Sequence, residues 1–101
     1  MTREKASIIA NDFFKDMNPE FWNGHGETPT TFDERPWDCL LSESDRLDIT
    51  LFYDPLEEQW CHCCEIVDEQ SNEMTEMLTG YGIDSFFNLV DTIMDICRYY
   101  D

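Results

Sequence analysis

The amino-acid sequence predicts a small α+β domain in which helices pack on one face of a β-hairpin. Two alternating apolar runs, at about 47–53 and 59–67, are typical of half-buried strands. Apolar residues at helical spacing near both ends of the chain predict helices there. The 101 residues, 42% of them hydrophobic, suffice for one modest core, so residues 1–101 are expected to form a single domain.

The first element is a helix that begins after Thr2 and ends near residue 17. Thr2 is a suitable N-cap, and a following Asn-Pro pair stops the helix. Apolar residues at helical spacing predict its buried face: Ala6, Ile9, Ala10, Phe13 and Met17. The next segment, 18–36, contains three prolines and two glycines and is expected to be a long loop. For residues 37–44 a short helix or turn and a third strand are both open.

A β-hairpin is expected in the middle of the chain. One face of its first strand carries Leu47, Ile49, Leu51 and Tyr53, and one face of its second strand carries Trp60, His62, Cys64 and Ile66. Asp54-Pro55 opens the turn between the strands. Because a two-stranded hairpin alone is marginal in water, helices must cover one face of it.

Two helices are expected after the hairpin. A short helix over about 72–79 follows Ser71 as N-cap and ends at Gly80. Its inward residues are Met74, Met77 and Leu78. A longer helix over about 85–100 has a well-spaced apolar stripe: Phe86, Leu89, Val90, Ile93, Ile96, Cys97 and Tyr100.

The net charge is the most unusual property of the chain. Twenty-three acidic residues face six lysines and arginines, which gives a net charge of −17. Small domains usually carry a net charge of about 2–8 in magnitude. Between Leu47 and Cys97 the sequence has twelve acids and no lysine or arginine. Such an excess repels itself and destabilises the compact state, so it exceeds what solubility requires.

This charge disfavours several classes of function. Direct binding to DNA, to RNA or to an anionic membrane surface is opposed by its sign. The first twenty residues lack the apolar segment of a signal peptide, and no apolar run approaches the ~20 residues that span a bilayer. The odd cysteine count then predicts reduced thiols and a cytoplasmic location, the host cytoplasm if the gene belongs to a phage.

The run Cys61-His62-Cys63-Cys64 raises the question of a metal site. Structural zinc needs four ligands, usually from two CxxC-like pairs, and only one cluster is present. Strand alternation also places Cys63 and Cys64 on opposite faces. Packing is therefore the preferred interpretation, and we expect no metal or cofactor, with a small Cys/His metal-binding regulator as an alternative function. No motif for nucleophilic, phosphate-binding or metalloprotease chemistry is present, so we expect no enzyme.

The twelve acids of the cation-free segment are the candidate partner-binding residues. A four-residue step along a helix rises about 6 Å, close to the ~6.8 Å of two base steps along one DNA strand. Rows of such acids over one side of the fold would resemble a line of phosphates. The candidates are Asp48, Asp54, Glu57, Glu58, Glu65, Asp68, Glu69, Glu73, Glu76, Asp84, Asp91 and Asp95.

In size, charge and lack of a catalytic motif the chain resembles the small acidic proteins with which phages and mobile elements block host defence, such as anti-CRISPR and anti-restriction DNA mimics. The resemblance carries over no individual residue. It implies a stoichiometric inhibitor that occupies the basic nucleic-acid-binding surface of a nuclease or CRISPR effector. An immunity protein or antitoxin that neutralises a basic toxin nuclease is the alternative of the same physical type.

Overall fold

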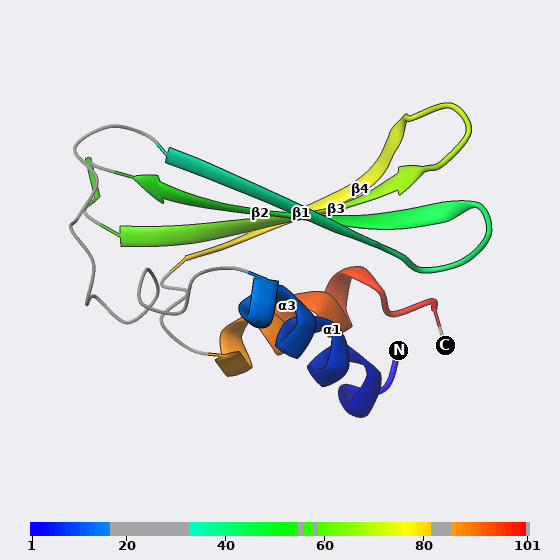
Figure 1. Cartoon of the computed structure of the whole chain (residues 1–101), viewed down its shortest axis with the longest axis horizontal. Helices are drawn as coiled ribbons and strands as arrows, with labels where there is room; N and C mark the ends of the chain where they lie inside the picture. The colour runs from blue at the N-terminus through cyan, green and yellow to red at the C-terminus, as the bar shows by residue number, and fades with distance from the viewer. Residues whose placement is uncertain (17–32, 55, 58, 82–85, 101) are drawn as a thin grey trace.

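The computed structural model describes residues 1–16, 33–54, 56–57, 59–81 and 86–100, without the side chains of 33–35, 53–54, 59–60 and 81. Two helices and four strands follow one another in these residues: α1 (Arg3–Asp16), β1 (Asp33–Leu40), β2 (Asp45–Asp54), β3 (Gln59–Asp68), β4 (Met74–Tyr81) and α3 (Phe86–Ile96). The strands form one antiparallel sheet in the order β1-β2-β3-β4. Both helices lie on the same side of this sheet (Figure 1). The predicted small α+β fold is therefore confirmed.

The predicted hairpin is formed by β2 and β3. Their register pairs Leu47 with Ile66, Ile49 with Cys64 and Leu51 with His62, and all six of these side chains are buried. The alternation expected from the sequence is therefore confirmed, since these residues share the face that the helices cover. The structure extends the first strand by two residues at its start and one at its end, to 45–54, and the second by one residue at its end, to 59–68.

Strand β1 contains the first half of the segment 37–44, for which the sequence left helix, turn and strand open. Residues 37–40 belong to this strand, in which Trp37 pairs with Ile49 and Cys39 with Leu47, while 41–44 form the turn to β2. The backbone N–H groups of Leu41 and Ser42 both donate to the Asp45 carbonyl oxygen. The loop prediction is wrong for residues 33–36, which start β1, and residues 17–32 lie outside the described residues.

The predicted short helix over 72–79 is wrong, because this segment forms β4. Met74, Met77 and Leu78 fit helical spacing, but so few residues make only a marginal helix. Pairing with β3 instead satisfies backbone groups on one side of the strand and lets Leu78 pack beside the core opposite Cys64. Asn72, with a positive φ of 60°, turns the chain back toward β3.

Both terminal helices form as the sequence predicts. The Thr2 hydroxyl oxygen accepts the backbone N–H of Lys5, which is the expected N-cap of α1. α3 is shorter than the predicted 85–100 and ends at Ile96, with a turn at 97–99. Its predicted apolar stripe is otherwise correct. The fully buried part of that stripe is Leu89, Val90, Ile93, Ile96 and Cys97.

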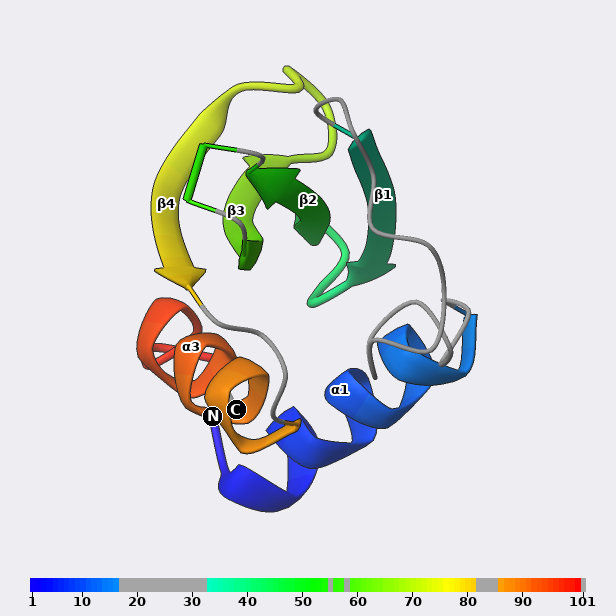
Figure 2. The ribbon, with the colours of Figure 1, turned by 90° about the vertical axis from the view of Figure 1, so that its left-hand side faces the viewer.

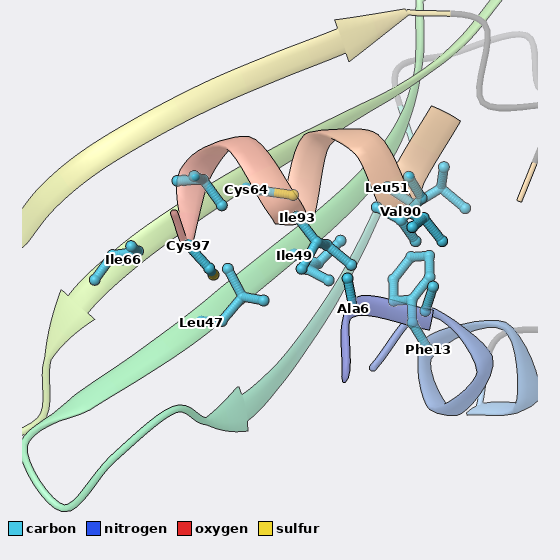
Figure 3. Packing of buried hydrophobic residues seen from close by; sticks show 13 residues of the cluster. Ala6, Phe13, Leu47, Ile49, Leu51, Cys64, Ile66, Val90, Ile93 and Cys97 are labelled. Carbon is cyan, nitrogen blue, oxygen red and sulfur yellow. The ribbon is translucent and has the colours of Figure 1, made fainter. Parts of the chain in front are cut away.

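The core lies between the two helices and the covered face of the sheet. Figure 3 shows Ala6 and Phe13 of α1 turned toward Ile49 and Leu51 of β2, with Ile93 of α3 beside them. Full burial of a leucine, isoleucine or phenylalanine side chain of this core stabilises the fold by about 1.5–3 kcal/mol relative to exposure. These contacts hold α1, α3 and the sheet together as one unit.

Trp37 closes one side of this core. Its ring contacts Phe13 edge to face, with 5.6 Å between ring centroids, and its Nε1–H donates to Asp16 Oδ2 at 2.7 Å. A partner for the indole N–H is what a largely buried tryptophan needs. Trp37 thus packs against the core.

His62 is the one buried polar residue among those described, with 1% of its surface exposed. Its Nε2 lies 2.7 Å from Thr92 Oγ1 on α3, while no described group bonds to its Nδ1. Burial lowers the pKa of His62 to about 4, so the ring is neutral near pH 7. The ring also lies against Gly80, its register partner on β4, and a Cβ atom at position 80 would overlap ring atoms. Glycine is therefore required at position 80.

We expect Gly80→Ala to destabilise the protein by about 1–3 kcal/mol, because the added methyl group overpacks the site against the His62 ring. Chemical denaturation of Gly80→Ala, His62→Ala and the double variant would measure this coupling. The penalty should shrink in the His62→Ala background, whereas Thr79→Ala, one residue earlier and exposed, should change stability little. Equal penalties in both backgrounds would contradict the overlap.

We expect His62 to destabilise the fold as the pH falls from about 7 to 4. The pKa of His62 in the folded protein lies below the unfolded value of 6.5. Between these two pKa values the ring is therefore protonated in the unfolded chain and neutral in the folded protein. At ~1.4 kcal/mol per pKa unit, this loss amounts to about 3 kcal/mol by pH 4. An NMR titration should find the His62 ring neutral at pH 5. Titration near pH 6.5 would show that the ring is solvated instead.

Candidate functional site

The face of the sheet opposite the helices is uncovered by any described element (Figures 1 and 2). Because successive strand residues point to opposite faces, the positions between the core residues lie on this side. We call it the open face and define it by its exposed and half-buried described side chains: Pro36, Asp38, Leu40, Arg46, Asp48, Thr50, Phe52, Cys63, Glu65, Met74, Met77 and Thr79.

Three carboxylates form a row across the open face. Asp38 of β1 pairs with Asp48 of β2, and Asp48 pairs with Glu65 of β3. With strands about 4.8 Å apart, this acid row spans roughly 10 Å. Like charges directly opposite each other destabilise a sheet, so the row has a cost in the free protein. The row ends at Met77, the partner of Glu65 on β4.

Arg46 compensates part of the acid row. Its Nε donates to Asp48 Oδ1 at 2.6 Å, and this bond raises the pKa of Arg46 above its usual value. The same guanidinium lies 3.8 Å from Glu69 and donates to the Asn72 side chain at 2.7 Å. One cation is therefore shared between Asp48 and Glu69, while no described cation is bonded to Asp38 or Glu65.

Exposed apolar side chains flank the acid row. Leu40 on β1 is 68% exposed, and Met74 and Met77 on β4 are 52% and 51% exposed. Protein interfaces combine desolvated apolar anchors with a polar rim, and methionine adapts to irregular surfaces. The open face has this composition: its carboxylates cross β1, β2 and β3 at one register, and its most exposed apolar groups lie on the edge strands β1 and β4.

Three of the predicted acids lie at the β3–β4 turn: Asp68, Glu69 and Glu73. Asp68 Oδ1 accepts the backbone N–H groups of Gln70 and Ser71, each at 2.9 Å, and these bonds lower its pKa. Asp68 therefore has a structural role in the turn, which is a frequent use of aspartate. Glu69 and Glu73 are exposed beside it and extend the negative charge from the open face around the end of the hairpin.

Three other predicted acids lie on the side of the helices. Glu76 occupies a position of β4 that faces α3, and Arg98 donates to its Oε1 at 2.7 Å. Asp91 on α3 pairs with Arg3 of α1 at 2.9 Å, and Asp95 on α3 is exposed. The structure thus supplies cations from outside the segment 48–96 to acids within it.

Among the remaining predicted acids, only Glu57 has a side chain within the described residues. Glu57 is exposed in the β2–β3 turn, at the end of the hairpin distant from the acid row. Glu58, Asp84 and the side chain of Asp54 lie outside the described residues. Of the predicted acids that the structure describes, Asp48 and Glu65 therefore lie together on the open face, Glu69 approaches Asp48 through Arg46, and the others lie elsewhere.

Asp38 is the residue of the acid row that sequence reasoning missed. It lies before the cation-free segment and inside 37–44, whose structure the sequence left open. The alternation of Trp37 and Cys39, which face the core, with Asp38 and Leu40 was the available signal. Only the pairing of β1 with β2 aligns Asp38 with Asp48.

The cysteines of the strands are divided between the two faces of the sheet, as alternation predicts for 61–64, and Cys97 follows α3. All five thiols are free, and Cys61, Cys64 and Cys97 are buried. Burial raises the pKa of Cys97 to about 12 and that of Cys39 to about 11, so neither thiol is ionised near pH 7. In the part of the chain that the structure describes, no three His, Cys, Asp or Glu side chains come together as metal ligands.

Comparison of the chain with protein-family models, with curated proteins and with solved structures gives no match. Within the described residues, neither helix has the length and apolar character of a transmembrane span.

We expect sodium chloride to raise the melting temperature of the free protein. Between about 0.01 M and 0.15 M the Debye length falls from about 30 Å to 8 Å, which screens repulsion among exposed carboxylates. Differential scanning fluorimetry would measure this rise, and Asp38→Asn/Glu65→Gln should show a smaller one because two like charges of the row are gone. A melting temperature that does not rise with salt would mean that the carboxylates are locally compensated.

Proposed function

We propose that this protein is a non-catalytic inhibitor that uses its open face to occupy the basic nucleic-acid-binding surface of an enzyme. A defence nuclease or CRISPR effector is the proposed target, in the cytoplasm of the cell where that enzyme works. The observation that carries the proposal is the acid row Asp38–Asp48–Glu65, flanked by exposed Leu40 and Met77. A basic groove relieves the repulsion within such a row and also covers its apolar edges.

Electrostatics supports a strongly basic partner. A charge of −17 attracts a cationic groove over long range, and each phosphate-binding lysine or arginine that meets a carboxylate releases counterions as it does with DNA. Like charges in the row cost stability in the free state, so part of the binding energy comes from removing that cost. The charge thus favours association while opposing direct contact with nucleic acid itself.

The rigidity of the sheet supports binding through a defined shape. The acid row is built on three paired strands whose other face is fixed by Leu47, Ile49 and Cys64 in the core. Carboxylates held on strands keep their spacing better than carboxylates on loops. Met74, Met77 and Leu40 add the apolar contacts that a flexible acidic chain lacks.

The reactivity of the buried groups favours binding over catalysis. His62 is neutral and bonded to Thr92 inside the fold, away from the open face. Cys63 does reach the open face, but burial and the neighbouring Glu65 raise its pKa, which makes it a poor nucleophile. The open face therefore offers carboxylates and apolar contacts as its recognition groups.

A competition experiment tests this function. The protein is titrated into a panel of purified nucleases and CRISPR effectors, each with and without its DNA or guide complex bound. We expect inhibition of at least one enzyme, weakened by salt and lost when the nucleic acid already fills the site. Unchanged binding to the loaded enzyme would exclude the proposed mode. A target encoded beside this gene as a toxin would assign the immunity-protein alternative.

Neutralising the acid row should slow association with that target. For Asp38→Asn/Glu65→Gln we expect an association rate reduced roughly threefold to tenfold at low salt, because both steering charges face the partner. The matched control is Asp12→Asn/Asp95→Asn, which removes the same charge from exposed positions of α1 and α3. Surface plasmon resonance would measure both variants. Equal slowing would show that net charge alone, and not the open face, guides binding.

A further inference from the structure

The outer edge of β4 has no backbone partner in the described structure. β4 pairs with β3 on one side, and no further backbone hydrogen bond joins it to another described element. Figure 2 shows β4 at one margin of the sheet and β1 at the other, with α3 below β4 on the side of the core. The register shift of the β3–β4 pair lies near the turn, so residues 76–81 form a regular edge.

The two edges of the sheet differ in their protection against further pairing. Proteins protect free edges with charges, proline or bulges, because an unprotected edge pairs with other strands. β1 contains Asp33, Glu34, Arg35, Pro36 and Asp38 within eight residues. The sequence of β4, MTEMLTGY, has no proline and one charged residue. Its glycine is accounted for by the His62 ring and not by edge protection.

β4 is also a locally neutral segment of a strongly acidic chain. Its single acid, Glu76, is bonded to Arg98 at 2.7 Å. Met74 and Met77 expose about half of their surface at the same edge. Two copies of a chain with a charge of −17 repel each other, so self-association is least opposed where the charge is neutralised and apolar surface is exposed.

We propose that β4 pairs antiparallel with β4 of a second copy, so that two four-stranded sheets become one of eight strands. A two-fold axis sets this edge against itself, which is the usual symmetry of protein dimers. The pairing satisfies the outward-facing backbone groups of residues 76–81 and covers Met77 at the seam. Both open faces then lie on one side of the continuous sheet. In each copy Met77 lies between the last acid of the row, Glu65, and the seam where the two β4 strands meet.

A foreign strand is the competing occupant of this edge, and charge favours the second copy. The free backbone of β4 offers a basic partner no charge to bind, whereas a second copy meets there a strand whose single acid is already bonded to Arg98. The dimer is therefore expected to strengthen with salt, since screening reduces the remaining repulsion. Binding to a basic target is expected to weaken with salt, so the affinities of the two associations change with salt in opposite directions.

Purified protein alone tests the dimer, independently of any target. Sedimentation velocity should find a monomer–dimer equilibrium whose dimer fraction rises with concentration and with sodium chloride. Hydrogen exchange at low and high concentration should find added protection of backbone amides in 74–81 and none in 33–40, the other edge. A monomer under all these conditions, or protection at 33–40 instead, overturns the proposal.

A charge substitution provides the matched comparison. Met77→Asp places two like charges at the seam and should weaken dimerisation at least tenfold. Leu40→Asp makes the same kind of change at an exposed position of β1 and should weaken it much less. Equal effects of the two substitutions overturn the proposed seam, as does protection of 74–81 that follows only the addition of a basic target. Because the exchange measurement uses the unaltered chain, it decides the question even if Met77→Asp fails to fold.

Discussion

The packing of α1 and α3 against a single face of the sheet is the constraint on which the other features depend. It fixes Leu47, Ile49 and Cys64 toward the core and therefore assigns the residues between them to the opposite side. Because strand side chains alternate with a period of two, no acid between two core positions can avoid the open face. The acid row is thus a consequence of where the helices lie.

Antiparallel pairing then converts acids distant in sequence into neighbours. Asp38, Asp48 and Glu65 lie 10 and 17 residues apart along the chain and yet occupy adjacent strands at one register. The same folding brings Arg3 to Asp91 and Arg98 to Glu76. Tertiary structure therefore neutralises part of the helical side and leaves the open face with Arg46 as its described cation.

In β4 the spacing of apolar residues favours a helix, whereas the contacts with β3 and α3 favour a strand. The spacing of Met74, Met77 and Leu78 favours a helix, and Ser71 is a reasonable cap for one. A free β3 edge beside it offers backbone pairing over seven registered positions, which a helix of two turns cannot match. His62 supports the same choice, because its ring fills the space above Gly80 and bonds to Thr92 on α3. Pairing with β3 and packing under α3 thus outweigh the helical spacing.

The sequence by itself determined the α+β class, the helix behind Thr2, the β2–β3 alternation and the buried stripe of α3, because these follow from hydrophobic periodicity within short segments. It also determined the excess of negative charge, which depends on composition alone. Only the tertiary structure decided that 33–40 and 74–81 are strands and that Asp38 joins Asp48 and Glu65. It likewise decided that Asp91 and Glu76 are neutralised by Arg3 and Arg98. Strand pairing and ion pairing join residues far apart in sequence, and no local spacing encodes which partners meet.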